Sequence, residues 1–200
     1  MKLSILARAL SAALLACATV GATAANVSLS GDIRYNTDIV QVSFSLAAAG
    51  AVKVWTDSWQ SGLNFDPVAA VWAKSGNGYT LLSEVDDDDS IGAGQGSFDA
   101  GLGFGLLGAG QYLVTLAASP NYARGTTLAA GFGFDGSTPI LIADWNQPGY
   151  NVNANDQKGT FWRINLQGVT QAALVPEPSA GLMTALGLAA LGVAIHRRKS

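Results

Sequence analysis

The sequence predicts an all-β fold: an antiparallel β-sandwich or jelly roll of about eight or nine strands, with a cleavable leader before it and one transmembrane helix after it. Short segments rich in Val, Phe, Trp, Tyr and Thr alternate with Gly, Asn and Asp clusters, as strands alternate with turns. Between the two ends, no window of a dozen residues carries helical periodicity. Residues 25–174 are therefore predicted to form one β-domain.

The N-terminal residues 1–24 have the layout of a secretory signal peptide. Two basic residues precede an apolar run over 9–20, and Ala22 and Ala24 frame an A-x-A cleavage site for signal peptidase. The leader also holds Cys17 after Leu-Leu-Ala, which loosely resembles a lipoprotein box, so lipidation at Cys17 stays open as an alternative. Either route implies export of the residues that follow.

The strands of the body are predicted from alternation. From Val40 to Leu46, apolar Val and Phe alternate with Gln and Ser, as expected for a strand buried on one face. The other predicted strands are 51–56, 68–73, 79–84, 111–117, 127–134, 140–144 and 160–169. Their apolar positions are expected to form the core, namely Val42, Phe44, Val52, Val54, Val71, Leu81, Tyr112, Val114, Phe132, Phe161 and Ile164.

The segment 103–108 satisfies the pattern G-x-G-x-x-G literally. A dinucleotide site needs that loop between a strand and a helix, with an acidic residue about twenty positions further on. Here a strand pattern follows, and no acid lies at that distance. We therefore expect a flexible Gly-rich connection and no nucleotide site.

The C-terminal residues 175–200 combine three parts in order: Val175-Pro176-Glu177-Pro178, an uncharged run over 179–195, and a basic terminus. As a helix, the seventeen-residue run would measure roughly 26 Å, which just spans a hydrocarbon core. The basic cluster should stay in the cytoplasm, which leaves the body outside the inner membrane. The prolines keep the segment before the helix extended, as a protease requires.

This tail resembles the PEP-CTERM sorting signal of Gram-negative bacteria. The resemblance implies processing by an exosortase at the motif Val175, Pro176, Glu177 and Pro178, after transient anchoring in the inner membrane. It also implies a final location at the cell surface or in the extracellular matrix. A permanent, uncut anchor is the alternative.

The body shows a second resemblance over residues 28–117. Val52-Lys-Val-Trp-Thr-Asp-Ser58, Phe65-Asp-Pro-Val-Ala-Ala-Val-Trp72, the aspartate run 86–89 and Gly108-Ala-Gly-Gln-Tyr-Leu-Val114 occur in an order similar to that of the DVUA-type PEP-CTERM family. Bacterial pre-peptidase C-terminal domains are more distantly similar. Both resemblances imply a jelly-roll-like sandwich without conserved catalytic chemistry.

Composition restricts what the body can do. The single cysteine, Cys17, lies in the leader, and the single histidine, His196, lies in the tail. Thiol and Ser-His-Asp nucleophiles and His/Cys zinc sites are therefore excluded for the body. Six basic residues face thirteen acidic ones over 25–175, a net charge of −7 that disfavours nucleic acid as a partner.

The run Asp86, Asp87, Asp88, Asp89 is the candidate metal site. Four adjacent carboxylates repel one another unless water, salt or a cation relieves them. Calcium binds loop carboxylates, and an extracellular site can be weak and still filled. Because loops converge at the ends of a sandwich, Asp57 or Asp66 could join the run. A solvated acidic turn without metal is the alternative.

Two further hypotheses concern ligands. Trp59 and Trp145 lie among Asn, Gln and Asp in predicted loops, a setting that suits the apolar face of a sugar ring. The alternative is that each tryptophan caps an end of the core. Asp66 and Asp86 could instead serve as the acid and base of a glycosidase, although aspartates at sandwich loops are commonplace.

Together these features predict an exported, non-catalytic structural or binding protein of the cell envelope or of an extracellular polysaccharide matrix such as a biofilm. Its expected partners are signal peptidase, an exosortase and extracellular polysaccharide, with Ca²⁺ as the one cofactor considered. The matrix setting follows from the resemblance of the tail. A carbohydrate-binding module and a carboxylate-only hydrolase are the alternatives.

Overall fold

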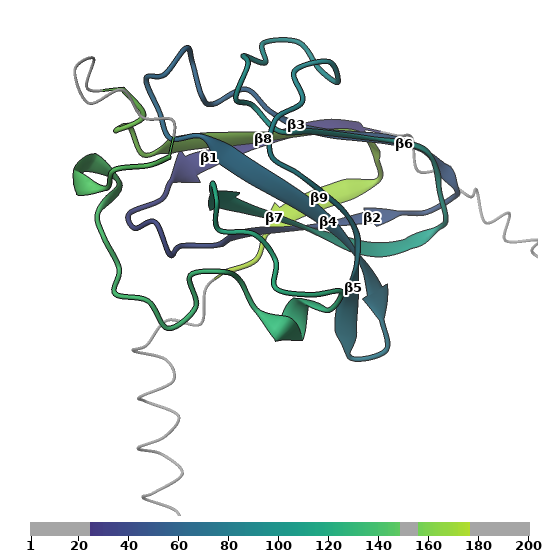
Figure 1. The fold of residues 1–200 in the computed structure, drawn as a ribbon. Helices are drawn as coiled ribbons and strands as arrows, with labels where there is room; N and C mark the ends of the chain where they lie inside the picture. The colour runs from purple at the N-terminus through teal and green to yellow at the C-terminus, as the bar shows by residue number, and fades with distance from the viewer. Residues whose placement is uncertain (1–24, 149–155, 177–200) are drawn as a thin grey trace, which may run out of the picture.

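The computed structural model describes residues 25–148 and 156–176, which form nine strands in two facing antiparallel sheets (Figure 1). One sheet has the order β1 (Ala25–Asp32), β8 (Phe161–Val169), β3 (Gly50–Thr56), β6 (Gly101–Leu107). The other has the order β5 (Gly78–Val85), β4 (Pro67–Ser75), β7 (Gly110–Ala118), β2 (Val40–Leu46), β9 (Gln171–Leu174). The prediction of an all-β sandwich is confirmed.

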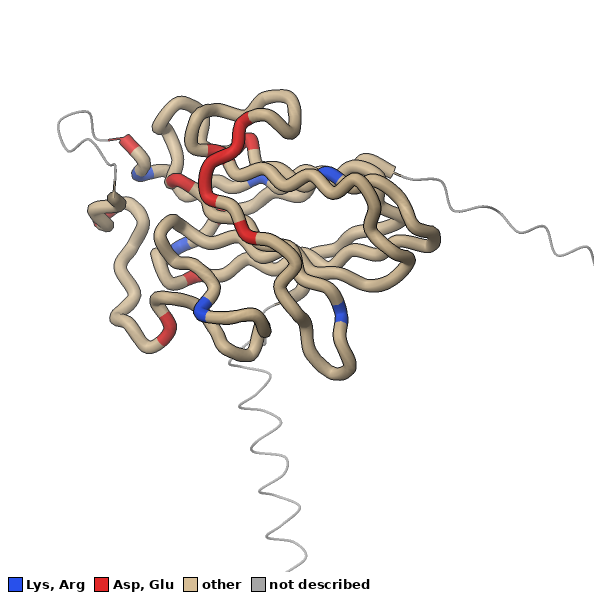
Figure 2. The backbone as a smooth tube through the Cα atoms, turned by 45° about the vertical axis from the view of Figure 1, so that its right-hand side comes forward, with Lys and Arg blue, Asp and Glu red and all other residues tan. Residues whose placement is uncertain are grey.

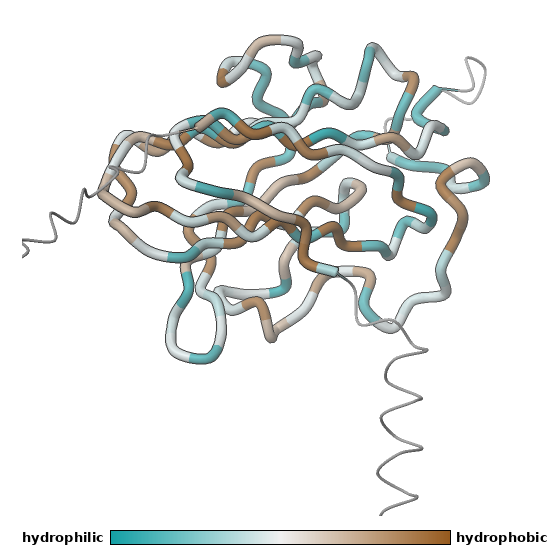
Figure 3. The backbone as a smooth tube through the Cα atoms, turned by 180° about the vertical axis from the view of Figure 1, so that it is seen from behind, coloured by the Kyte–Doolittle hydropathy of each residue, from teal (hydrophilic) through white to brown (hydrophobic). Residues whose placement is uncertain are grey.

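The core lies between the two sheets because strand alternation points one set of side chains inward. In β2, Val42 and Phe44 are buried, and in β3 the same holds for Val52 and Val54. Hydrophobic and hydrophilic positions accordingly alternate along the strands (Figure 3). Each such aliphatic or aromatic side chain contributes about 1.5–3 kcal/mol when it is fully buried.

Strands β4 and β7 are covered on their outer face as well. Trp72 and Leu113 lie on that face, and Phe132 packs over them from the segment that follows β7. The rings of Trp72 and Phe132 meet edge to face with centroids 6.3 Å apart, and Trp72 Nε1 donates a hydrogen bond to Thr115 Oγ1. This second layer explains why every residue from Pro67 to Trp72 is buried.

Two predicted strands are wrong for the same reason. The segments 127–134 and 140–144 form loops with two short 3₁₀ turns, η1 (Leu128–Ala130) and η2 (Ile142–Asp144). Segment 127–134 pairs with a sheet through one bridge, Thr127 with Thr80 of β5, and Leu141 makes one bridge with Tyr35 in the loop after β1. Phe132 and Ile142 are buried against existing layers, whereas Ile140 and Leu141 are exposed, so the apolar pattern does not come from strand pairing.

Three strands of the structure were not predicted from the sequence, namely β1, β6 and β9. The Gly-rich segment expected as a flexible connection is part of β6, paired with β3, and it is followed by β7 and not by a helix. At the start of β6 a Cβ on Gly101 would lie 2.5 Å from the carbonyl oxygen of Asp88. Glycine there lets the acidic loop lie close to the strand.

The last strand leads directly into the predicted processing motif. β9 pairs with β2 at the sheet edge, and Val175 N donates a hydrogen bond to Gln41 O at 2.9 Å. Val175 and Pro176 are within the described residues. Outside them lie the predicted leader cleavage site at Ala22 and Ala24, Cys17, Glu177, Pro178 and the predicted helix 179–195. The described part contains no helix long and apolar enough to cross a membrane.

Candidate functional site

Three strand ends meet at one end of the larger sheet. Because β4 runs antiparallel to both β5 and β7, the start of β4 lies beside the ends of its two neighbours. Asp66 immediately precedes β4, Asp86 immediately follows β5, and Ser119 immediately follows β7. The acidic run therefore emerges at this end of the sheet, as the tube coloured by charge shows (Figure 2).

Asp66, Asp86 and Asp87 form an acidic cluster in which one carboxylate oxygen from each lies within 4.8 Å of the others. Asp66 is 7% exposed, Asp86 is half-buried and Asp87 is exposed. No lysine or arginine of the described residues pairs with any of the three. As the sequence analysis anticipated, Asp66 lies close to the aspartate run, and its neighbours there are Asp86 and Asp87.

The surroundings of the cluster hold Asp86 in place. Its Oδ2 accepts hydrogen bonds from Ser119 Oγ at 3.0 Å and from Tyr122 Oη at 2.5 Å. Its Oδ1 is buried without a partner among the described residues. One side of the carboxylate is therefore oriented by two hydroxyl groups, while the other is left without a donor.

Gln147 fixes the backbone of Asp66. Its side-chain oxygen accepts from Asp66 N at 3.0 Å, and its Nε2 donates to the carbonyl oxygens of Asp66, at 2.9 Å, and Ser119, at 2.8 Å. The side chain of Asp66 has no comparable support, since its Oδ1 is buried without a partner in the described part of the chain. Gln147 lies 81 residues from Asp66 along the sequence, so no short-range sequence pattern predicts this contact.

The cluster resists full ionisation. Burial, and then repulsion from Asp86, Asp87 and Asp99, raises the pKa of Asp66 to about 8. Burial and the charge of Asp86 also raise the pKa of Asp87. The three carboxylates can share the site only if a proton or a cation offsets their charge.

The other residues predicted for a metal site lie apart from the cluster. Asp88 Oδ1 accepts hydrogen bonds from the backbone and hydroxyl of Ser90, which lower the pKa of Asp88. Asp89 is exposed and is not part of the cluster. Asp57 is not part of it either: it follows β3 in the other sheet, and its carboxylate is paired with Arg163. The six-aspartate set predicted from the sequence therefore reduces to three.

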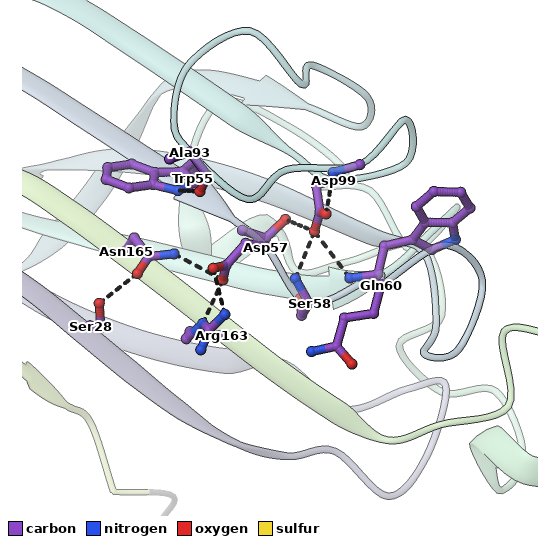
Figure 4. A network of polar contacts seen from close by, with 12 residues as sticks. Ser28, Trp55, Asp57, Ser58, Gln60, Ala93, Asp99, Arg163 and Asn165 are labelled. Carbon is purple, nitrogen blue, oxygen red and sulfur yellow. Dashed lines mark hydrogen bonds and ion pairs between the residues drawn. The ribbon is translucent and has the colours of Figure 1, made fainter.

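Asp57 belongs to a separate polar network that joins β1, β8 and the end of β3 (Figure 4). Arg163 donates from Nε and from a terminal nitrogen to the two oxygens of Asp57, both at 2.6 Å. Asn165 Nδ2 also donates to Asp57, and Asn165 Oδ1 accepts from Ser28 Oγ. The bond to Asp57 raises the pKa of Arg163.

Asp99 is a structural residue that the sequence analysis missed. It is fully buried, and its Oδ1 accepts from Thr56 Oγ1 at 2.7 Å and from the backbone nitrogens of Ser58 and Trp59 (Figure 4). Its Oδ2 accepts from Gly96 N at 2.8 Å. Four donors in one buried carboxylate fix the loop after β3 against the loop before β6.

The two tryptophans predicted as sugar platforms differ. Trp145 is 9% exposed and packs edge to face against Phe134 in the core, so of the two alternatives for Trp145 the structure supports the ring that caps the core and not the sugar platform. Trp59 is half-buried beside Phe98, and a Cβ on Gly96 would lie 2.6 Å from its ring. The loop that contains Gly96 thus packs against one face of the Trp59 indole.

The fold brings Asp66 and Asp86 together, as an acid and base pair would need. Neither residue, however, lines any of four pockets found among the described residues. A sugar bound between two carboxylates requires open access to both, whereas Oδ1 of each is buried. The hydrolase hypothesis stays a prediction that these contacts do not support.

Comparison with known proteins identifies the tail. Residues 174–199 match the PEP-CTERM protein-sorting motif. This motif implies a secreted protein that is anchored transiently in the membrane and processed by an exosortase. No curated protein is significantly similar to the chain. The likeness of the body to DVUA-type and pre-peptidase C-terminal domains stays a prediction.

Proposed function

We propose that this chain is a non-catalytic structural or binding protein of the cell envelope or the extracellular polysaccharide matrix. The observation that carries the proposal is the junction between domain and signal. Strand β9 ends at Leu174, and the sorting motif is matched from residue 174 onward. A complete sandwich is followed without a linker by an export and processing signal, so the sandwich is the part delivered.

The internal polar residues support a structural role. The carboxylate of Asp99 accepts hydrogen bonds from four donors of the protein. That of Asp57 accepts hydrogen bonds from Arg163 and Asn165. These groups hold loops and strands together. The acidic balance of the body keeps it soluble and favours contact with cationic or neutral polymer over anionic nucleic acid.

Cell fractionation tests the proposal. The full-length chain and a chain lacking residues 177–200 are expressed in the producing bacterium from which the native gene has been deleted. We expect the full-length chain in the envelope or matrix fraction, the shortened chain to be displaced from it, and the deletion to weaken the matrix. An unchanged matrix together with full-length protein confined to the inner membrane would contradict the proposal.

A carbohydrate-binding role is the second candidate, and it now depends on Trp59. This indole is half-buried, and the adjacent Gln60 is exposed, so an apolar surface lies beside hydrogen-bonding groups. Retention on extracellular polysaccharide should fall for Trp59→Ala. The matched control is Leu63→Ala, which removes an exposed apolar side chain from the same loop. Equal retention of both variants and the wild type would eliminate this candidate.

A further inference from the structure

We propose that Asp66, Asp86 and Asp87 form a binding site for one hard divalent cation, with Ca²⁺ as the preferred ion. Of the four aspartates in the run, only Asp86 and Asp87 are proposed as ligands. The third ligand is Asp66, which immediately precedes β4. The proposal also separates the site from Asp57, whose carboxylate is already paired with Arg163.

The spacing of the oxygens fits a single ion. Calcium binds oxygen ligands at about 2.3–2.6 Å, so two ligands on opposite sides of the ion lie about 4.6–5.2 Å apart. The oxygens offered by the three aspartates all lie within 4.8 Å of one another. Three oxygens spaced at that upper limit stand about 2.8 Å from their common centre, so one ion can contact all three carboxylates after small side-chain adjustments and without rearrangement of the strands.

Buried, unpartnered oxygens point to a ligand independently of that spacing. Asp66 is 7% exposed, and its Oδ1 has no hydrogen-bond partner among the described residues. The Oδ1 of Asp86 is also buried and has no hydrogen-bond partner among the described residues. Buried carboxylate oxygens are normally paired, because leaving them unsatisfied costs the desolvation energy in full. A cation bound through these oxygens would satisfy both carboxylates.

The supporting contacts are those expected around metal ligands. Ser119 and Tyr122 orient Asp86 through its other oxygen, and Gln147 fixes the backbone on either side of Asp66. Such outer contacts hold ligands in position and are part of most metal sites. Asp87 is exposed, so its side of the site is open to the water that completes the coordination.

The chemistry of the ligands selects the ion. An all-oxygen set of carboxylates suits Ca²⁺ or Mg²⁺ and not Zn²⁺ or Cu²⁺, which prefer nitrogen and sulfur. Mg²⁺ demands near-ideal octahedral geometry and keeps most of its water, whereas Ca²⁺ accepts irregular sets of six to eight oxygens. A bound Ca²⁺ would link the start of β4 to the end of β5.

The test is titration of the EDTA-treated full-length chain, purified in mild detergent, with CaCl₂ and separately with MgCl₂. Calorimetry should show one Ca²⁺ bound per chain, with a dissociation constant in the range of about 10⁻⁴–10⁻³ M typical of weak extracellular sites. Mg²⁺ should bind more weakly. The melting temperature should rise with Ca²⁺, because the ion binds only the folded chain.

Matched variants locate the site. Asp66→Asn and Asp86→Asn should weaken Ca²⁺ binding by about tenfold or more, since each removes a charged ligand. Asp89→Asn makes the same charge change in the same run outside the cluster and should leave the affinity within about twofold. Asp87→Asn alters an exposed residue that does not endanger folding and should also weaken binding.

Three results would overturn the proposal. The first is no binding heat and an unmoved melting temperature in the wild-type chain up to about 10 mM CaCl₂, beyond the range of weak extracellular sites. The second is undiminished binding in a folded Asp66→Asn or Asp87→Asn chain. The third is an equal loss in Asp89→Asn, which would show diffuse attraction to the acidic run and not a defined site.

Discussion

Asp66 and Asp86 lie twenty positions apart in the chain, yet they place carboxylate oxygens within 4.8 Å of each other. The pairing of β4 with β5 causes this approach, because Ala69 stands opposite Val85 and the two aspartates extend from the same end of the pair. The free energy of unfolding should therefore depend on anything that changes the charge of this pair.

Without metal, the stability of the chain should fall as the pH rises. Asp66 has a pKa near 3.8 in the unfolded chain and about 8 in the folded one, so folding favours its protonated form. That contribution is fully present below pH 3.8 and is lost as the pH rises through about 8. In EDTA, the free energy of unfolding of the wild type, measured by urea denaturation, should fall by on the order of 3 kcal/mol between pH 5 and pH 8.

Asp66→Asn should remove most of that slope, because the amide carries no charge at either pH. Asp89→Asn should keep the slope of the wild type and serves as the control. A wild-type slope that survives in Asp66→Asn would assign the pH dependence to other groups.

The pair of Asp57 and Arg163 should stabilise the small sheet measurably. Arg163→Gln leaves Asp57, whose side chain is 12% exposed, with Asn165 as its remaining partner, and should cost about 1–2 kcal/mol of unfolding free energy. The double variant with Asp57→Asn should be less destabilised than the sum of the two single variants. Additive effects in urea denaturation would show that the two side chains do not interact.

Substitution of Asp99 should lower the free energy of unfolding more than substitution of any other aspartate of the described residues. Asp99→Ala leaves the donors of Thr56, Ser58, Trp59 and Gly96 without their acceptor and should cost about 3 kcal/mol or more. Thr56→Val removes one of these bonds and the bond from Ala100 N to Thr56 Oγ1, but leaves three donors on Asp99, so it should cost less. If Asp99→Ala melts like the wild type, the carboxylate does not hold the two loops.

Strand β9 should belong to the folded domain, although it adjoins the sorting motif. A chain that ends after Pro176 keeps the bond from Val175 to Gln41 and should melt like the full-length chain. A chain that ends after Thr170 loses the pairing with β2 and should melt at a lower temperature, by about 2–4 °C for each kcal/mol of unfolding free energy lost. Equal melting temperatures would show that β9 adds no stability.

The sequence predicts the parts of the fold that depend on local alternation. The pattern from Val40 to Leu46 correctly identifies β2 and its inward side chains. The strand β9 is only four residues long, and its partner β2 is more than a hundred residues away, so no local signal identifies it. In the segments 127–134 and 140–144 the pattern is equally apolar, but these segments form no strand: Phe132 and Ile142 are buried against the layers, and Ile140 and Leu141 are exposed.

The candidate site was predictable in part. An aspartate run at a strand end indicates a metal site, and the closeness of Asp66 follows from the convergence of loops in a sandwich. The partners of the cluster do not follow, because Gln147 and Tyr122 act across 81 and 36 residues respectively. Asp57 lies outside the cluster because it follows β3 of the other sheet, where it pairs with Arg163 across 106 residues.

The mass of the mature protein tests the central claim, export followed by removal of the sorting signal. Intact-mass spectrometry is applied to the protein from the cells and from the culture medium. We predict a species that begins near Ala25 and ends near Glu177, so that β9 and the acidic cluster are retained. A membrane-bound species that still carries residues 178–200 as its only form would contradict the account.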